Sequence, residues 1–307
     1  MTSPKQFDGG YFLAHIFDRV EAVPDAAAPE PSESSLVLNL VSEMTGDEVQ
    51  QFRNDIRAIS QYEASEHLIS FVRDNLVDLL DNIANHGYDF DQRRTTSATI
   101  MESAQLEISR LLSNVLSAFK SVLDHGETYF SRTYGKNSSE FLAWKSAQKT
   151  EFDTVFAYRF FYALRNFTQH IDAAPINLKF KAEANKEAVT MRVDLDRESL
   201  LRDGGDKFKR LEVEILAMPG PLSLVELLEP WSDSFERLAA YYLGQRAKEA
   251  LPHSLRLLDL RTRIAKDYGQ LAMASVGPTE IPPRELSTSL QHVPETTARR
   301  IAGREAA

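Results

Sequence analysis

The sequence predicts a mainly α-helical fold: a helical bundle built on a long antiparallel helical hairpin, with a small β-hairpin element and further C-terminal helices. Three observations predict it. Apolar residues recur at three- and four-residue steps over two long segments, 96–134 and 140–172. Only a short turn, "TYGKNSS", separates these segments, so the two helices must lie antiparallel as neighbours. After Pro175, apolar and polar residues alternate as they do in strands.

The composition is that of an ordinary globular protein. The 307 residues are 43% hydrophobic and 26% charged, which is enough material for one large domain or two smaller ones. With 35 basic and 45 acidic residues the net charge is −10, which argues against a surface coated uniformly in cations for nucleic acid or membrane binding. It leaves room for a small basic pocket. The absence of cysteine excludes disulfides and thiolate chemistry.

The N-terminal region lacks the pattern expected of a secretory signal. No long apolar run follows a basic start, and no segment approaches the roughly 18 apolar residues of a membrane span. We therefore expect a cytoplasmic protein without a membrane partner. Residues 1–40 are predicted to be an N-terminal segment, with one short helix around 11–20 and a linker at "VPDAAAPEPSESS".

Residues 41–175 are predicted to form the helical bundle. Two helices are expected between 45 and 84, with Thr45 as the N-cap of the first and Glu48 completing a capping box. The stretch "NHGYD" is expected to end the second helix. The hairpin follows, and its second helix carries an apolar side made of Phe152, Phe156, Phe160, Ala163, Phe167 and Ile171.

Residues 176–275 are predicted to hold a β-hairpin and C-terminal helices. The strands are expected at "INLKFKAEA" and "AVTMRVDLD", while "RLEVEIL" fits either a third strand or a helix end. Helical patterns resume at "SLVELLEPWSDSFERLAAYYLGQRAKEAL" and "HSLRLLDLRTRIAKDYG". Residues 276–307, rich in proline, serine and threonine, are predicted to be a flexible tail.

Several sequence signatures of catalysis are missing. The sequence has no G-x-x-x-x-G-K-[ST] phosphate loop, no H-E-x-x-H and no G-x-S-x-G elbow. Its seven histidines are scattered, and no two lie four residues apart. We therefore expect no metal and no cofactor.

A polar sector on the helix at "FAYRFFYALRNFTQHIDAAP" is the main candidate site. Arg165 and His170 lie about 140° apart on a helix of 100° per residue, and they flank this sector. Its other members are Tyr162, Asn166 and Gln169, with Arg159 nearby. A permanent cation, a titratable base and amide or phenol donors together suit an anion such as a phosphate.

The spacing Arg165-Asn166-x-x-x-His170, late in a helical hairpin, resembles the signature of the HEPN superfamily, an arginine followed after four to six residues by a histidine. The resemblance covers about residues 45–175. It implies a metal-independent endoribonuclease of the toxin, RNA-processing or antiphage defence kind, acting as a homodimer. Arg165 and His170 would be catalytic and Asn166 a positioning residue. A restraining antitoxin or defence partner is a further expectation from this resemblance.

Other interpretations of the same residues stay open. Arg165 could pair with Glu107 or Asp172, and His170 could cap its helix through the dipole, so that the polar seam is purely structural. Alternatively Glu107 could orient the His170 imidazole. A non-catalytic HEPN-like interaction or regulatory protein is the second functional hypothesis. Phe161 falls off the apolar stripe and is expected at a dimer contact.

Overall fold

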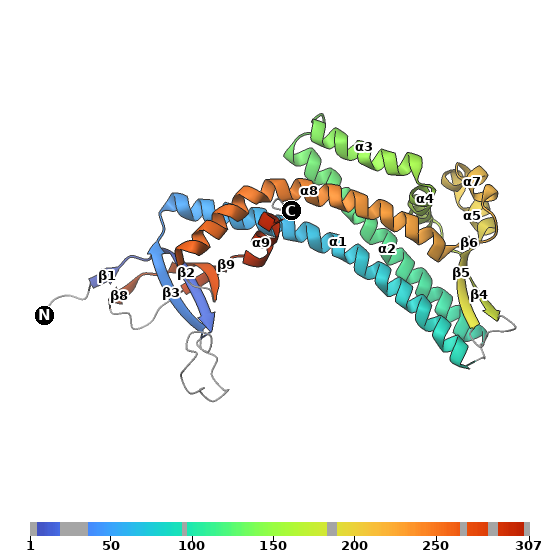
Figure 1. The fold of residues 1–307 in the computed structure, drawn as a ribbon, viewed down its shortest axis with the longest axis horizontal. Helices are drawn as coiled ribbons and strands as arrows, with labels where there is room; N and C mark the ends of the chain where they lie inside the picture. Colours follow the sequence, from blue (N-terminus) through green and yellow to red (C-terminus); the bar gives the residue numbers. More distant parts are fainter. Residues whose placement is uncertain are drawn as a thin grey trace. The chain divides into compact units, whose positions relative to one another are not determined.

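The computed structural model describes residues 5–18, 36–93, 97–182, 189–264, 269–281 and 288–303. The chain forms two compact units (Figure 1). Unit 1 combines Met1–Ser65 with Gly244–Ala307, and unit 2 is Glu66–Leu243. Two long helices, α1 (Gly46–Arg93) and α8 (Leu224–Ile264), each contribute residues to both units.

Unit 1 is built on antiparallel strands that come from both ends of the chain. A four-stranded sheet has the order β3-β2-β7-β9, and β1 pairs with β8 separately. The β2–β3 register shifts between Leu13 and Ala14, which is the mark of a β-bulge. The strands are β1 (Lys5–Phe7), β2 (Gly10–Asp18), β3 (Leu36–Glu43), β7 (Gln270–Val276), β8 (Thr279–Ile281) and β9 (Thr288–His292).

Strand β2 replaces the short helix predicted around 11–20, and that prediction is wrong. Leu13, Ala14, His15 and Ile16 are all buried, so both faces of the strand are covered. Ala14 and Ile16 pack in one cluster with Ala272 and two further apolar residues. A strand buried on both faces shows no alternation in its sequence, which is why the pattern resembles that of a helix. The predicted linker at 23–35 lies outside the described residues.

The start of α1 confirms the predicted capping box. The Thr45 backbone N–H donates to Glu48 Oε2 at 2.8 Å, and the Glu48 N–H donates to Thr45 Oγ1 at 3.3 Å. These bonds satisfy two of the donors that a helix N-terminus leaves free. The helix then continues to Arg93 without the predicted interruption and without the stop at "NHGYD". The two helices expected in this region are therefore one.

The flexible tail predicted for 276–307 is wrong for its described part. Strand β9 pairs with β7, and α9 (Glu295–Gly303) buries Ala298 and Ile301. Thr297 Oγ1 donates a 2.9 Å hydrogen bond to Glu63 Oε1 of α1. Few large apolar residues suffice here because the strand gains its stability from a partner strand that the local sequence does not show.

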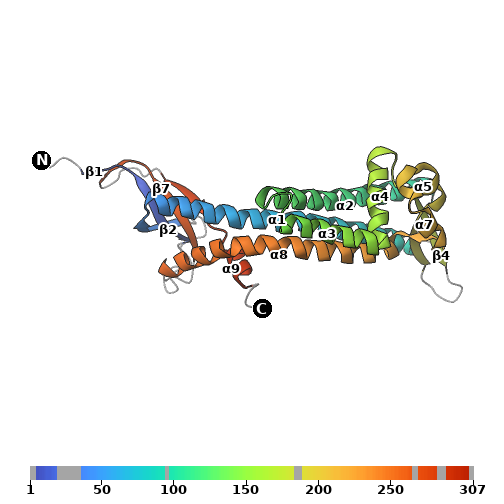
Figure 2. The same ribbon diagram turned by 90° about the horizontal axis from the view of Figure 1, so that it is seen from above.

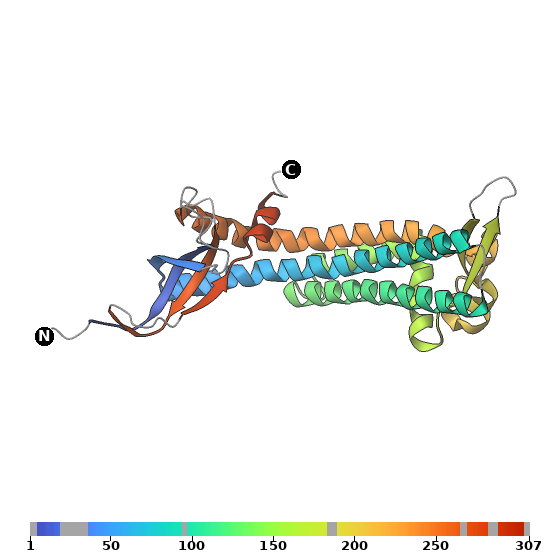
Figure 3. The ribbon, with the colours of Figure 1, turned by 90° about the horizontal axis from the view of Figure 1, so that it is seen from below.

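Unit 2 is mainly helical with a three-stranded antiparallel sheet of order β4-β5-β6. Besides its parts of α1 and α8, unit 2 contains α2 (Ala98–Thr133), α3 (Ser139–Thr154), α4 (Phe156–His170), β4 (Ile176–Ala182), β5 (Val189–Leu195), α5 (Arg197–Asp203), α6 (Gly205–Lys209), α7 (Glu212–Ala217) and β6 (Leu222–Ser223). Helix α2 runs alongside the unit 2 part of α1 (Figure 3), and α4 runs crosswise to α2 and α3 (Figure 2).

The helix predicted over 140–172 is broken at Val155, which is extended with φ −110° and ψ 110°. The two halves bury different faces: Phe160 and Phe167 of α4 are buried, while Phe152 of α3 is 42% exposed. Ile171, also placed on the apolar side, is 52% exposed. Each half follows its own neighbours, so no single apolar stripe runs through both.

The predictions for the chain after Pro175 are confirmed in part. The β4–β5 hairpin is confirmed, with Leu178 opposite Val193. The segment "RLEVEIL" forms α7 and no strand. The two C-terminal helical patterns are one helix, α8, which passes through Pro230 and Pro252. In the described part of the chain, no helix combines the length and apolarity needed to cross a membrane.

Candidate functional site

The residues predicted for an anion site all lie in unit 2, six of them on α4. Arg165 and Asn166 are half-buried, whereas Gln169 and His170 are exposed at the C-terminal end of the helix. His170 is the last residue of α4. The structure thus places the two principal residues on one short helix, with His170 facing solvent.

The Asn166 amide is used by its own helix. Its Nδ2 donates a 2.7 Å hydrogen bond to the backbone oxygen of Tyr162. The Tyr162 side chain is partly exposed and its ring meets Phe152 edge-on, with centroids 6.0 Å apart. The ring contact joins α4 to the end of α3, whereas the Asn166 bond stays within α4.

Arg159 closes the C-terminal end of α3. Its Nη1 donates to the carbonyl oxygens of Phe152 at 2.7 Å and Asp153 at 3.0 Å, and its Nη2 forms an ion pair with Glu214 of α7. Cations are favourable at a helix C-terminus because the last carbonyl groups carry partial negative charge. Arg159 therefore ties three helices together.

Glu107 forms an ion pair with Arg110, with Oε1 and Nη2 2.6 Å apart. Hydrogen bonding to the Arg110 guanidinium lowers the pKa of the Glu107 carboxyl from its ordinary value. Among the contacts of the described residues, none joins Glu107 to Arg165 or to His170. The Asp172 carboxylate accepts from the Ala173 N–H at 2.7 Å.

Arg165 keeps a feature that the fold does not explain. Its Nε is buried and has no hydrogen-bond partner among the described residues. A buried donor without an acceptor costs about 1–3 kcal/mol.

Phe161 of the same helix is fully buried, and its ring centroid lies 5.6 Å from that of Trp231. The prediction that Phe161 reaches a dimer contact is therefore wrong.

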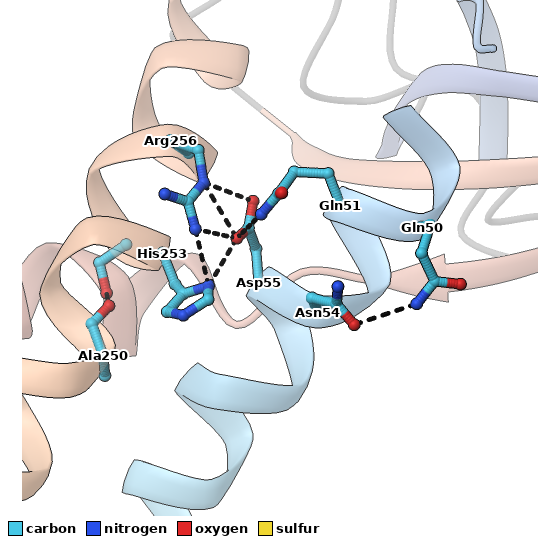
Figure 4. Close-up of polar contacts among 8 residues, drawn as sticks. Gln50, Gln51, Asn54, Asp55, Ala250, His253 and Arg256 are labelled. Atoms are coloured by element: carbon cyan, nitrogen blue, oxygen red, sulfur yellow. Dashed lines mark hydrogen bonds and ion pairs between the residues drawn. The ribbon is translucent and has the colours of Figure 1, made fainter. Parts of the chain in front are cut away.

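A second group of polar residues, missed by the sequence analysis, surrounds Asp55 in unit 1. The Asp55 side chain is only 2% exposed. Figure 4 shows Gln51, His253 and Arg256 pointing toward its carboxylate. Oδ1 accepts from Gln51 Nε2 at 2.8 Å and from Arg256 Nη2 at 2.6 Å, and lies 2.6 Å from His253 Nδ1.

The arrangement indicates which nitrogen of the imidazole faces Asp55 with a proton. A carboxylate can only accept hydrogen bonds, so His253 Nδ1 must carry the proton that faces Asp55. Arg256 Nη2 also lies 2.8 Å from the same nitrogen. Because both groups are then donors, they do not bond to each other, and each donates to Asp55. Asp55 is therefore a buried acceptor that gathers three side chains from α1 and α8.

A cavity of about 180 Å³ adjoins this cluster in unit 1. Leu13 and Phe52 supply buried apolar wall, and Asp55 and Arg256 supply polar wall. We call it the unit 1 cavity. It is lined by Leu13 of β2, Ser42 and Glu43 of β3, Met44, Glu48, Gln51, Phe52 and Asp55 of α1 and its approach, and Arg256, Asp259, Leu260 and Arg263 of α8.

One signal in the sequence could have found this cluster. Phe52, Ile56 and Ile59 form the buried stripe of the first turns of α1, and Asp55 stands on that stripe, three residues after Phe52 and four before Ile59. A carboxylate on an apolar helix face needs partners, because burying an unpaired charge is costly. Gln51 lies four residues away, but His253 and Arg256, 198 and 201 residues away, cannot be identified from the local sequence.

The described residues contain no group of three or more histidine, aspartate or glutamate side chains placed to hold a metal ion. No protein-family model, no curated protein sequence and no solved structure matches this chain.

Proposed function

We propose that this protein is a non-catalytic interaction or regulatory protein that binds its partner at the unit 1 cavity. The observation that carries the proposal is the cavity itself, of about 180 Å³, with Leu13 and Phe52 on its apolar side and the Asp55–Arg256 pair on its polar side. Binding sites combine an apolar lining with a few fixed polar groups in this way.

The Asp55 cluster is a fixed part of the cavity wall. The Asp55 carboxylate already accepts from Gln51 and Arg256 and faces the proton of His253. The cluster is suited to holding a wall of the cavity in one shape, and a preformed wall lowers the entropic cost of binding.

The test places a bulky side chain in the cavity. Ser42 is exposed and lines the cavity, so Ser42→Trp should block it without disturbing the core. Asn39→Trp, also exposed on β3 but away from the cavity, is the matched control. Compounds or peptides that raise the melting temperature of the wild type and of Asn39→Trp should fail with Ser42→Trp. Equal stabilisation of all three proteins contradicts the proposal.

A second candidate function is the metal-independent endoribonuclease implied by the HEPN resemblance. The observation that favours it is Arg165, whose buried Nε has no partner among the described residues and whose helix carries the exposed His170 five residues later. An RNA phosphate would give Arg165 the acceptor it lacks once binding uncovers this nitrogen. A homodimer would bring two such pairs together, with Asn166 positioning the phosphate, and Tyr162 and Gln169 would contribute donors.

In this mechanism neutral His170 accepts the proton of an RNA 2′-hydroxyl. The 2′-oxygen bonds to the adjacent phosphorus, the bond to the 5′-oxygen breaks, and that oxygen takes a proton from water or from the second His170. The product is a 2′,3′-cyclic phosphate, and DNA is resistant because it lacks the 2′-hydroxyl. Arg165 stabilises the charge on the phosphoryl oxygens.

The test is cleavage of a panel of RNAs with a chelator present. The second candidate requires cleavage by the wild type, loss of cleavage in His170→Ala, and full activity in His125→Ala, a matched exposed histidine on α2. Absence of cleavage on every RNA, or equal cleavage by His170→Ala, removes this candidate and leaves the interaction function in place.

A further inference from the structure

We infer that the partner at the unit 1 cavity is an extended basic peptide segment, which pairs with the free edge of β3 and places one lysine or arginine side chain in the cavity. This inference rests on the proposed interaction function and names its partner. It combines two separate observations, an open strand edge and the charge of the adjoining cavity.

In the part of the chain that the structure describes, β3 is the terminal strand in the order β3-β2-β7-β9, so one of its edges has no strand paired to it. Residues 39–43 are all exposed, and Leu40 and Val41 are 37% and 38% exposed. Lysine and proline, which commonly protect natural edge strands, are absent from "LVLNLVSE", and the protections that this strand carries are the bulge at Val41 and the charge of Glu43 at its end. An edge of this kind can accept an added strand, with main-chain hydrogen bonds supplying affinity.

The register of β3 determines which side chains of an added strand lie on the face of the sheet that holds the cavity. Ser42 pairs with Leu13 across the β2–β3 ladder, and both residues line the cavity. The bulge that leaves Val41 without an opposite residue on β2 sets this register. Residues directly opposite each other in a sheet share one face. A partner residue opposite Ser42 therefore points its side chain to the face that holds the cavity.

The charge of the cavity selects a cation. Its two arginines are matched, Arg256 by Asp55 at 2.6 Å and Arg263 by Asp259 at 3.1 Å. Four carboxylates and two arginines line the cavity, so its lining carries more negative than positive charge. Among the described residues no ion pair holds Glu43. The fourth carboxylate, Glu48, interacts with Arg263, which already pairs with Asp259.

Glu48 stays ionised at neutral pH. Hydrogen bonds from the backbone and the hydroxyl of Thr45 lower the pKa of the Glu48 carboxyl from its ordinary value. Those bonds use Oε2, at 2.8 and 2.9 Å. Glu48 and Glu43 thus leave an excess of negative charge at the rim of the cavity.

The apolar wall suits the rest of a basic side chain. Leu13 and Phe52 are 3% and 1% exposed, and both line the cavity. Lysine and arginine pack their methylene stems on apolar surface while the charged end stays near polar groups. A cavity of about 180 Å³ accommodates one such side chain and no folded element.

The experiment uses the full chain and a short fluorescent peptide of alternating valine and threonine with one central lysine. Fluorescence anisotropy should show saturable binding of this peptide, weakened by salt because the contact is electrostatic. The same peptide with central glutamine should bind roughly tenfold less tightly, and central glutamate should bind less tightly still. N-methylation of alternate backbone amides should abolish binding, since it removes the donors that pair with β3.

Two variants test the charge directly. Glu48→Gln keeps the capping box, because glutamine serves at this position, and removes the negative charge. We expect Glu43→Gln and Glu48→Gln each to weaken the lysine peptide about fivefold and to leave the glutamine peptide unchanged. Glu102→Gln, on exposed α2 surface in unit 2, is the control and should change nothing.

The outcomes separate the inference from the function it rests on. Equal binding of the lysine, glutamine and glutamate peptides overturns the charge selection. Equal binding of the N-methylated peptide, or of butylamine alone, overturns the added strand. In both cases Ser42→Trp still blocks binding and the interaction function stands. Failure of every peptide, together with no ligand sensitive to Ser42→Trp, removes the interaction function itself.

Discussion

Asp55 and Arg256 form an ion pair of unequal exposure: Oδ1 and Nη2 lie 2.6 Å apart, and the Asp55 side chain is 2% exposed while the Arg256 side chain is 43% exposed. Removing Arg256 should therefore destabilise Asp55 more than removing Asp55 destabilises Arg256. An arginine can turn to water when its acceptor is removed, whereas a buried carboxylate has no such alternative.

This asymmetry predicts the cost of losing Arg256. Arg256→Ala should lower the free energy of unfolding of unit 1 by about 2–4 kcal/mol, because it leaves the buried Asp55 carboxylate without its cation. Asp259→Ala, which breaks the exposed i,i+4 pair with Arg263, should cost no more than about 0.5 kcal/mol. Urea denaturation followed by circular dichroism measures both. Similar costs for the two variants would show that the Asp55 cluster contributes little to stability.

A pH dependence is expected in unit 2 from Glu151. Arg237 donates two hydrogen bonds of 2.8 Å to the Glu151 carboxylate. These bonds lower the pKa of Glu151 from its ordinary value of 4.5. A carboxyl whose pKa is lowered by folding binds protons more weakly in the folded state. Its contribution to stability is therefore complete above pH 4.5 and is lost as the pH falls through the range below that value.

Tryptophan fluorescence can follow this effect selectively, since the two tryptophans, Trp144 and Trp231, both lie in unit 2. Glu151→Gln should lower stability at neutral pH and flatten the decline of the unfolding midpoint below pH 4.5. Glu127→Gln, which removes an exposed partner of Lys145, should leave the decline as steep as in the wild type. An unchanged decline in Glu151→Gln would contradict the assignment.

Two helical glycines should respond in opposite directions to alanine. A Cβ on Gly126 of α2 would lie 2.6 Å from Cζ2 of the buried Trp144, so Gly126→Ala should cost about 1–3 kcal/mol through overpacking. At Gly244 of α8 nothing lies within 4 Å of the added atom, and alanine is the better helix former. Gly244→Ala should stabilise by about 0.5–1 kcal/mol. Thermal denaturation of both variants checks the contrast, and two shifts of the same sign would refute it.

The last helix should matter for stability. Ile301 of α9 is 1% exposed, and Ile301→Ala should cost about 2–4 kcal/mol through lost burial and the cavity left behind. Arg299→Ala, on the same helix with its side chain 62% exposed, is the control and should change stability by less than about 0.5 kcal/mol. If neither variant changes the melting temperature, α9 does not dock in solution.

Local chemistry predicted part of the fold. The Thr45–Glu48 capping box and the β4–β5 hairpin are set by residues close in sequence, and both are confirmed. The break at Val155 has no glycine or proline to mark it. It arises because α3 and α4 pack on different neighbours, and that competition is tertiary.

The sequence could not predict most of unit 1 for a related reason. The partners of β2 are β3 and β7, and β7 begins at Gln270, far along the chain. Strand formation depends on such pairing more than on intrinsic preference. The candidate site could not be predicted for the same reason, because His253 and Arg256 contact Asp55 only in the folded chain.

The division of unit 1 between the two ends of the chain has a consequence for synthesis on the ribosome. Unit 2 is one continuous segment, Glu66–Leu243, and all of its strands and helices can meet before the last part of the chain emerges. Strand β2 is made early and must wait for β7 with its second edge unpaired. Until then the apolar "GYFLAHIFD" lacks its β7 partner, and a transiently exposed apolar strand of this kind is the part of a nascent chain that favours chaperone binding.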